Sequence, residues 1–344
     1  AVVWLSLQTG NAILKLTQRD YAEHGMSSLV ALRGSPGAVN GEVFNALGAK
    51  IRGKSKLPVN RRTICFSPHP DDDVISMGGI LRKFVQNGND IAVAYMTSGN
   101  SAVFDHDVRR YVDFLRRLAS ESVVAVKTVN QLADRVVDFL DAKQPGDVDI
   151  PEVQDIKRMI RESEAVAGIE VMGLSRDHAR FLNLPFYQTG KVKKDPIGPA
   201  DVAIVRDLLI ELRPEIIFVA GDLSDPHGTH RMCKEAIDLA LADVYGPAAG
   251  AGAPARPEVW LYRGAWQEWD VTDATWLVPM SQEDLRLKIQ AIFKHQSQKD
   301  SAPFPGQDDR EFWQRVEARN KDTSALLDRL GLAEYFAMEA YVVV

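Results

Sequence analysis

Cysteine is scarce in this sequence. Its 344 residues include two cysteines, Cys65 and Cys233, which excludes both a disulfide-based scaffold and a zinc site of four cysteines. No continuous apolar run reaches the ~18 residues of a membrane span, so we expect none. Residues 1–8 lack the basic start and the long apolar stretch of a secretory signal peptide. We therefore expect a soluble, cytoplasmic protein.

An excess of positive charge is also missing. The chain has 41 Lys and Arg against 47 Asp and Glu, which gives a formal net charge of −6. This balance argues against a protein whose main task is to bind nucleic acid. Hydrophobic residues make up 45% and charged residues 26% of the chain, a composition typical of a globular protein. The first residue is Ala1 and not Met, which is compatible with a fragment or a processed product.

Residues 1–60 differ in pattern from the rest of the chain. Thr17 to Asp20 resembles a capped helix start, and apolar residues then recur at helical spacing. Gly34 to Gly37 interrupts this pattern, and a second short helix is expected around residues 43–47. Basic residues and a proline between positions 50 and 62 predict a linker. We expect residues 1–60 to form an N-terminal helical arm and linker, with the main domain over residues 61–344.

From residue 61 onward, short apolar strands alternate with helices. Strands are expected at residues 63–66, 91–96, 215–220 and 259–262, and helices at residues 74–86, 200–212 and 229–242. Apolar strands that alternate with helices indicate a parallel sheet covered on both faces. We therefore predict an α/β fold with a Rossmann-like, mostly parallel sheet.

One polar cluster, Ser67-Pro-His-Pro-Asp-Asp-Asp73, follows the first of these strands directly. Three adjacent carboxylates repel one another unless a cation or hydrogen bonds compensate. The carboxyl ends of parallel strands are also where ligands gather in such folds. An acidic helix N-cap is the alternative interpretation, but capping needs one Asp and does not explain His69.

A second polar cluster, Gly221 to His230, lies between the strand at 215–220 and a helix. His227 and His230 are three residues apart, so both can face one point at the start of the helix. A pair of ordinary surface histidines is the alternative. A His and an Asp from the first cluster and a His from the second would give three ligands and an open position, which is the arrangement of catalytic zinc.

Together the two clusters resemble the motifs of the PIG-L/LmbE family of zinc-dependent N-deacetylases. The resemblance rests on Pro68 to Asp73, followed by Gly78-Gly79, and on the later Asp225-Pro-His-x-x-His230. Two weaker similarities are Arg161 to Glu164 and the segment from Lys288 to His295-Gln-Ser-Gln298.

The resemblance to this family covers about residues 62–300, with an apparent insertion at about residues 101–155. The whole chain also resembles the C-terminal half of long proteins described as glucosamine-6-phosphate deaminase-like. In those proteins a domain of the sugar-phosphate deaminase type precedes the deacetylase-like domain. The resemblance therefore implies a fused N-terminal domain that this chain does not include.

The family resemblance implies a role for six residues. It implies that His69, Asp72 and His230 bind Zn²⁺ or another divalent ion. It also implies that Asp71 is the general base, that His227 stabilises the oxyanion, and that Arg161 contacts a substrate hydroxyl or phosphate. The implied reaction removes an N-acetyl group from an N-acetylglucosamine-type amino sugar or conjugate by attack of zinc-bound water. The implied partner is a small-molecule amino sugar, and a homo-oligomer is compatible with it.

Two positions depart from the family pattern. Asp73 stands where the family has Glu. Gly228-Thr229 replaces Pro-Asp between the two histidines, and that Asp orients the catalytic histidine, so Asp222 or Asp225 would have to replace it. Two other function classes therefore stay open: a metal-dependent phosphoesterase, and a catalytically weak sugar-binding or regulatory module fused to a deaminase-type domain.

Overall fold

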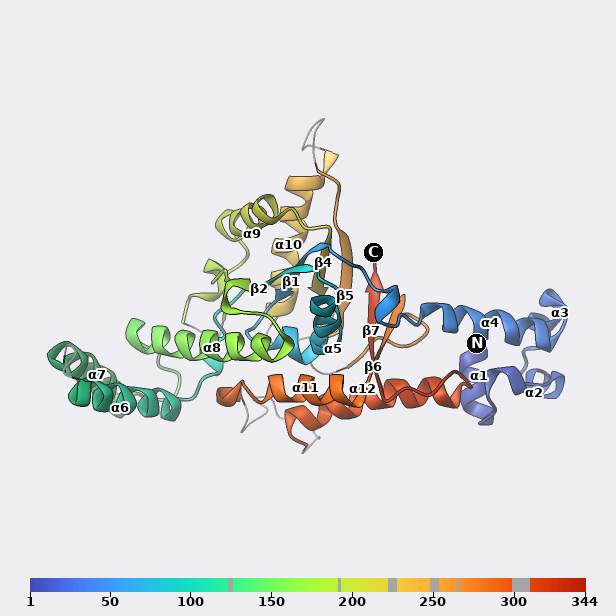
Figure 1. Cartoon of the computed structure of the whole chain (residues 1–344), viewed down its shortest axis with the longest axis horizontal. Helices are drawn as coiled ribbons and strands as arrows, with labels where there is room; N and C mark the ends of the chain where they lie inside the picture. Colours follow the sequence, from blue (N-terminus) through green and yellow to red (C-terminus); the bar gives the residue numbers. More distant parts are fainter. Residues whose placement is uncertain (123–125, 191–192, 222–227, 248–253, 265–266, 299–309) are drawn as a thin grey trace.

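A seven-stranded sheet with helices on both faces forms the centre of the molecule (Figure 1). The computed structural model describes residues 1–122, 126–190, 193–221, 228–247, 254–264, 267–298 and 310–344. Its strands are β1 (Arg62–Ser67), β2 (Asp90–Tyr95), β3 (Ala179–Phe181), β4 (Ile216–Ala220), β5 (Glu258–Tyr262), β6 (Trp276–Met280) and β7 (Ala337–Val343). The predicted α/β fold is confirmed.

Most strand pairs in the sheet are parallel, in the order β3-β2-β1-β4-β5-β7-β6. β1 pairs in parallel with β2 and β4, and only β7 runs antiparallel to its neighbours β5 and β6 among the described strands. The chain proceeds from β1 to β2 on one side and returns to β4 on the other. The strand order therefore reverses between β1 and β4, and folds of this kind bind ligands at the carboxyl ends of the strands at such a point.

Two hydrophobic cores lie on opposite faces of the sheet. One face is covered by α5 (Asp72–Gln86), α8 (Pro151–Met172), α11 (Gln282–Ile292) and α12 (Phe312–Arg329), and the other by α9 (Pro199–Leu212) and α10 (Thr229–Tyr245). Alternation along β1 explains both cores, since Cys65 packs into the first while Ile64 and Phe66 pack into the second. The prediction of helices on both faces is confirmed.

The N-terminal arm is helical, as expected. It contains α1 (Val2–Thr9), α2 (Gln18–Glu23), α3 (Ser27–Arg33) and α4 (Pro36–Lys50). Thr17 and Asp20 form the expected capping box of α2. The helix expected around residues 43–47 is longer than predicted, because Ser35 caps it and Pro36 occupies its first turn.

The arm packs against the C-terminal part of the chain. Leu5 and Leu47 share a core with Leu277 of β6, Leu327 of α12 and Met338 of β7. This core is separate from the two that flank the sheet.

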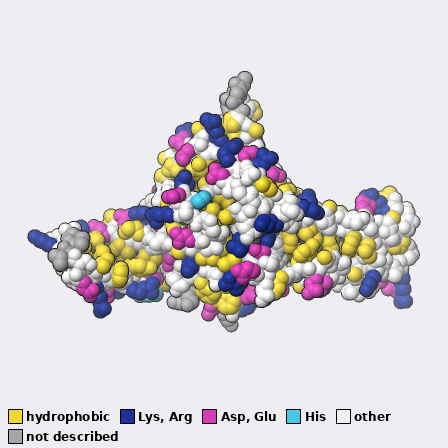
Figure 2. Space-filling model, viewed as in Figure 1, with side chains coloured by type: hydrophobic (Ala, Val, Ile, Leu, Met, Phe, Trp, Pro, Cys, Tyr) yellow, Lys and Arg dark blue, Asp and Glu magenta, His cyan; other side chains and the backbone are white. Residues whose placement is uncertain are grey.

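A helical hairpin extends from the end of the molecule opposite the arm (Figure 1). It consists of α6 (Asp105–Ser122) and α7 (Val126–Ala142), which pack together through Val108, Val112 and Val136. Figure 2 shows basic and acidic side chains interspersed over the central part of one face, with hydrophobic side chains exposed on both extensions. Within the described residues, no helix combines the length and the apolar character needed to cross a membrane.

Candidate active site

Three predicted metal ligands meet at the carboxyl ends of β1 and β4. Nδ1 of His69 and Nε2 of His230 each lie 3.2 Å from Oδ2 of Asp72. The centroids of the two imidazole rings are 5.3 Å apart. One ligand atom from each of the three residues lies within 4.8 Å of the others. His69 belongs to the loop after β1, whereas His230 lies in the first turn of α10, which follows β4.

A tight loop between β1 and α5 positions the first cluster. Ser67 Oγ donates a hydrogen bond to the carbonyl of His69 (2.6 Å) and accepts one from the backbone N–H of Asp73 (3.1 Å). Asp72 Oδ2 accepts from the backbone N–H of His69 (2.9 Å). Asp71 occupies the N-cap position of α5, but its side chain makes no capping hydrogen bond. The acidic N-cap alternative therefore does not account for the Asp71 carboxylate.

The adjacent carboxyls of Asp72 and Asp73 have opposite pKa shifts. Burial alone raises the pKa of Asp72, but His230 and His69 outweigh this effect and hold that pKa below its usual range. Burial raises the pKa of Asp73 to about 7, with a further contribution from the charge of Asp71. The buried Asp73 carboxyl accepts a hydrogen bond from the Tyr95 hydroxyl of β2 (3.0 Å). Asp72 is thus the anionic carboxylate beside the two histidines.

Arg161 on α8 contacts the predicted general base. Its Nη2 lies 3.1 Å from Oδ2 of Asp71, and its side chain is 1% exposed. Its Nε and Nη1 are buried without a hydrogen-bond partner among the described residues. Gly99 permits this close packing, because it has a left-handed φ of 62° and a Cβ there would lie 3.0 Å from Nε. Arg161 therefore holds Asp71 and presents two further donors.

Glu164, one turn further along α8, has a different partner. Its carboxylate accepts hydrogen bonds from the backbone N–H and the hydroxyl of Ser297, both at 2.7 Å. The two segments that gave weaker family similarities, Arg161 to Glu164 and His295 to Gln298, are thus in direct contact.

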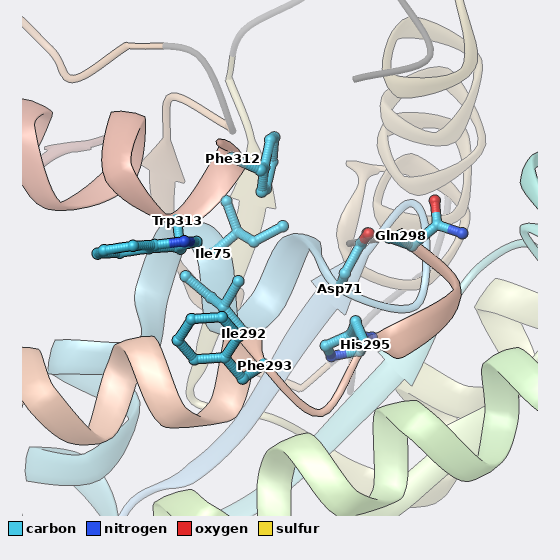
Figure 3. A pocket seen from close by; sticks show the side chains of 8 residues that line it. All are labelled: Asp71, Ile75, Ile292, Phe293, His295, Gln298, Phe312 and Trp313. Carbon is cyan, nitrogen blue, oxygen red and sulfur yellow. The ribbon is translucent and has the colours of Figure 1, made fainter. Parts of the chain in front are cut away.

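His295 is a site residue that was not singled out from the sequence. It is buried, and both its ring nitrogens lack a hydrogen-bond partner among the described residues. Burial lowers its pKa to about 4, so the ring is neutral near pH 7. With Asp71 and Gln298 it lines a cavity whose remaining walls are Ile75, Ile292, Phe293, Phe312 and Trp313 (Figure 3). The sequence signal was the His-x-Ser-Gln segment, which suggested a similarity but no role.

The predicted oxyanion-stabilising residue, His227, lies outside the described residues, as do Asp222 and Asp225. The neighbouring Gly228 has a φ of 68° immediately before α10. Proline is restricted to a φ near about −65°, so the proline of the family pattern could not adopt this conformation. The Gly228 departure therefore coincides with a different backbone path into α10.

Comparison with known proteins places this chain in a family. The profile of the PIG-L family, described as GlcNAc-PI de-N-acetylase, matches residues 64–241. The chain belongs to the PIG-L family. The matched region includes most of β1, all of β4 and all the residues of the candidate site except those that follow α10 in the sequence.

Two curated relatives of this PIG-L family chain differ in how much of it they match. A glucosamine-6-phosphate deaminase-like protein of Bacteroides thetaiotaomicron is 46% identical over 361 residues, which cover 99% of this chain and 54% of that protein. Diacetylchitobiose deacetylase of Thermococcus kodakarensis is 30% identical over 125 residues, which cover 35% of this chain and 43% of that protein. The chain thus spans about half the length of the curated relatives it matches.

Solved structures share the fold. The N,N'-diacetylchitobiose deacetylase of Pyrococcus horikoshii has a TM-score of 0.51 and 18% identity, with 83% of this chain and 84% of that chain covered. A conserved protein of Thermus thermophilus has a TM-score of 0.50 and 18% identity, with 82% and 94% covered. At this identity the comparison establishes the architecture alone.

Proposed function

We propose that this chain is a metal-dependent amide hydrolase that removes the N-acetyl group from an N-acetylglucosamine-type amino sugar or conjugate. The observation that carries the proposal is the meeting of His69, Asp72 and His230 at the carboxyl ends of β1 and β4, with Asp71 next to Asp72 in the chain. Membership of the PIG-L family supports it. The similarity to a diacetylchitobiose deacetylase supports the amino-sugar substrate.

The three clustered side chains suit a zinc ion. Two imidazole nitrogens and one carboxylate oxygen are ligands that Zn²⁺ accepts, and three protein ligands leave a position open for catalysis. His69, Asp72 and His230 would hold the ion. When bound, it would polarise the acyl carbonyl and lower the pKa of water.

Asp71 acts as the proton carrier in this proposal. Its carboxylate takes a proton from the attacking water as the new C–O bond forms, and it delivers that proton to the amine nitrogen as the C–N bond breaks. The products are acetate and a free amino sugar. Arg161 orients the Asp71 carboxylate through its 3.1 Å contact. We assign the two remaining donors of Arg161 to a substrate hydroxyl or phosphate, and His227 to stabilisation of the oxyanion.

The proposal is tested by metal analysis together with acetate release. The purified protein is loaded with Zn²⁺ and incubated with N-acetylglucosamine and diacetylchitobiose. We expect one metal ion per chain, which His230→Ala loses and Asp71→Asn keeps. Asp71→Asn should reduce turnover by ~10²–10⁴-fold. His106→Ala is the matched control, because His106 is an exposed histidine of α6 away from the cluster.

Two results would contradict parts of the proposal. Full metal occupancy in His230→Ala would contradict the assignment of that ligand. Bound metal without acetate release would favour a catalytically weak sugar-binding module, the function to which Gly228-Thr229 points. A phosphoesterase of the two-metal type receives less support, because the described residues contain one cluster of three such ligands.

A further inference from the structure

The cavity beside Asp71 is small and has two chemically different sides. Asp71 and Ile75 lie one turn apart at the start of α5, Ile292 ends α11, and Trp313 lies in the first turn of α12 (Figure 3). The volume of the cavity is about 30 Å³, so it exceeds the minimum that a single water needs. The cavity therefore admits a small group of a few heavy atoms.

The polar side of the cavity contains unused hydrogen-bonding capacity. His295 is 4% exposed, and neither ring nitrogen has a partner among the described residues. A neutral imidazole offers one donor and one acceptor. The opposite side consists of hydrocarbon from Ile75, Ile292, Phe293, Phe312 and Trp313. A small ligand with one polar and one apolar end would satisfy both sides.

The proposed reaction places such a group beside Asp71. The acyl carbon must lie within bond-forming distance of the water whose proton Asp71 accepts, so both substituents of that carbon start near this carboxylate. The amine side leads to a sugar ring, which a space of this size cannot hold. The acyl side of an acetamide ends in a methyl group, which it can hold.

We propose that this cavity is the acyl-binding pocket, and that Ile75 and Ile292 restrict the acyl group to about the size of acetyl. The inference rests on the proposed deacetylase function and adds to it the selection of the acyl chain. The methyl group packs against the two isoleucines, which are 3% and 8% exposed. The N–H of His295 donates to an oxygen of the released acid.

Chain length is the variable that tests this pocket. A single methylene that does not fit a hydrophobic pocket changes kcat/KM by ~10–200-fold. N-butyrylglucosamine carries two more methylenes than N-acetylglucosamine, so we expect its kcat/KM to be lower by ~100-fold or more. Shortening Ile292 to alanine opens the apolar wall at the end of α11.

The first experiment measures kcat/KM for N-acetyl-, N-propionyl- and N-butyrylglucosamine with wild type, Ile292→Ala and Ile217→Ala. We expect Ile292→Ala to reduce the acetyl-to-butyryl ratio by at least ~10-fold. Ile217→Ala is the matched control, since Ile217 is also buried but packs in the core on the other face of the sheet. An unchanged ratio in Ile292→Ala, or a wild-type ratio near one, would overturn the proposal.

The second experiment does not depend on turnover. Acetohydroxamate and butyrohydroxamate are titrated into the zinc-loaded protein by calorimetry, because a hydroxamate presents its acyl chain while its oxygens bind the metal. Wild type should bind acetohydroxamate at least ~10-fold more tightly, and Ile292→Ala should lose this preference. Equal binding of both by wild type, or binding of neither, would contradict the pocket.

The two experiments separate the two proposals. If wild type releases no acid from any N-acylglucosamine but prefers the short hydroxamate, the proposed function fails and the acyl pocket stands. If it hydrolyses all three substrates equally well and binds both hydroxamates equally, the deacetylase function stands and the pocket fails.

Discussion

At the scale of single residues, Arg161 and Asp71 are in contact, although separate roles were expected for them from the sequence. Arg161 was expected to contact the substrate, and Asp71 was expected to be the general base. Arg161 is nearly inaccessible to solvent, and its Nη2 contacts the carboxylate of Asp71. Arginine is suited to both tasks, because its planar guanidinium has five donors and can hold a carboxylate while it binds other oxygens. The same side chain can therefore orient the general base and contact the substrate.

We expect Arg161→Met to lower kcat/KM for N-acetyl substrates by at least ~10-fold while metal content stays unchanged. We expect kcat to fall and KM to rise, since the variant removes both the orientation of Asp71 and a substrate contact. Steady-state kinetics and metal analysis test this. A variant with a lower melting temperature and normal kinetics would show that the contact is structural only.

His295 should make stability depend on pH. Its ordinary pKa of 6.5 is lowered to about 4 in the folded state by burial. Between these pH values the unfolded chain binds a proton that the folded chain does not, so stability falls as pH falls. In the metal-free protein, we expect His295→Gln to reduce the loss of unfolding free energy over this range by up to ~3 kcal/mol.

Urea unfolding at several pH values across this range measures the effect of His295. His106→Gln serves as the control, because the His106 side chain is 69% exposed. An identical pH dependence in wild type and His295→Gln would contradict the prediction.

At the scale of elements, Gly78-Gly79 lets α5 pack closely against the C-terminal part of the chain. The backbone N–H groups of Gly79 and Ile80 donate to the Glu339 carboxylate of β7, at 2.9 and 2.8 Å. A Cβ on Gly79 would lie 2.9 Å from Cδ of Glu339, and one on Gly78 would lie 2.8 Å from Cγ of Lys288. Lys288 and Glu339 form a fully buried ion pair. This packing sets the position of the helix whose first residue is Asp72.

Gly79→Ala should therefore destabilise the protein by ~1–3 kcal/mol, because the added methyl group would overlap Met280 of β6 as well as Glu339 of β7. Gly41→Ala is the control. Gly41 lies inside α4 with no atom within 4 Å of its would-be Cβ, and alanine in an open helical position is more favourable by ~0.5–1 kcal/mol. Chemical denaturation of both variants tests the prediction, and equal effects would contradict it.

At the scale of the whole molecule, the N-terminal arm completes a core with the C-terminal strands. Leu5 of α1 is fully buried in the core that also contains Leu277, Leu327 and Met338. The side-chain amine of Lys50 also donates to the carbonyls of Val271 and Thr272. The arm and the sheet should therefore unfold together.

We expect Leu5→Ala to lower the stability of the entire protein by ~2–5 kcal/mol, as for other buried leucines. Leu32→Ala is the matched control, since Leu32 is also on the arm but 79% exposed. Thermal unfolding followed by circular dichroism and by loss of bound metal measures both. If Leu5→Ala shifted only a separate early transition, the arm would be an independent unit.

Local patterns were sufficient to predict much of this protein. Apolar runs bounded by polar residues predicted β1, β2, β4 and β5, and helical periodicity predicted the helices between them. The approach of the two clusters could be predicted because both directly follow parallel strands, and the carboxyl ends of such strands lie at one edge. The family resemblance, and not this geometry, selected His69, Asp72 and His230 among their residues. The assignment of His227 stays a prediction.

Contacts between distant segments were decided only by the tertiary structure. Arg161 and His295 are far from Asp71 in the sequence. No periodicity of apolar residues indicates that Arg161 of α8 contacts the Asp71 carboxylate, or that the end of α11 lines a cavity with it. The same holds for Glu339, which lies 260 residues after Gly79, and for the arm that packs on β6 and β7. Short-range sequence patterns specify an element and its buried face, whereas the choice of its partner depends on how all the buried faces pack together.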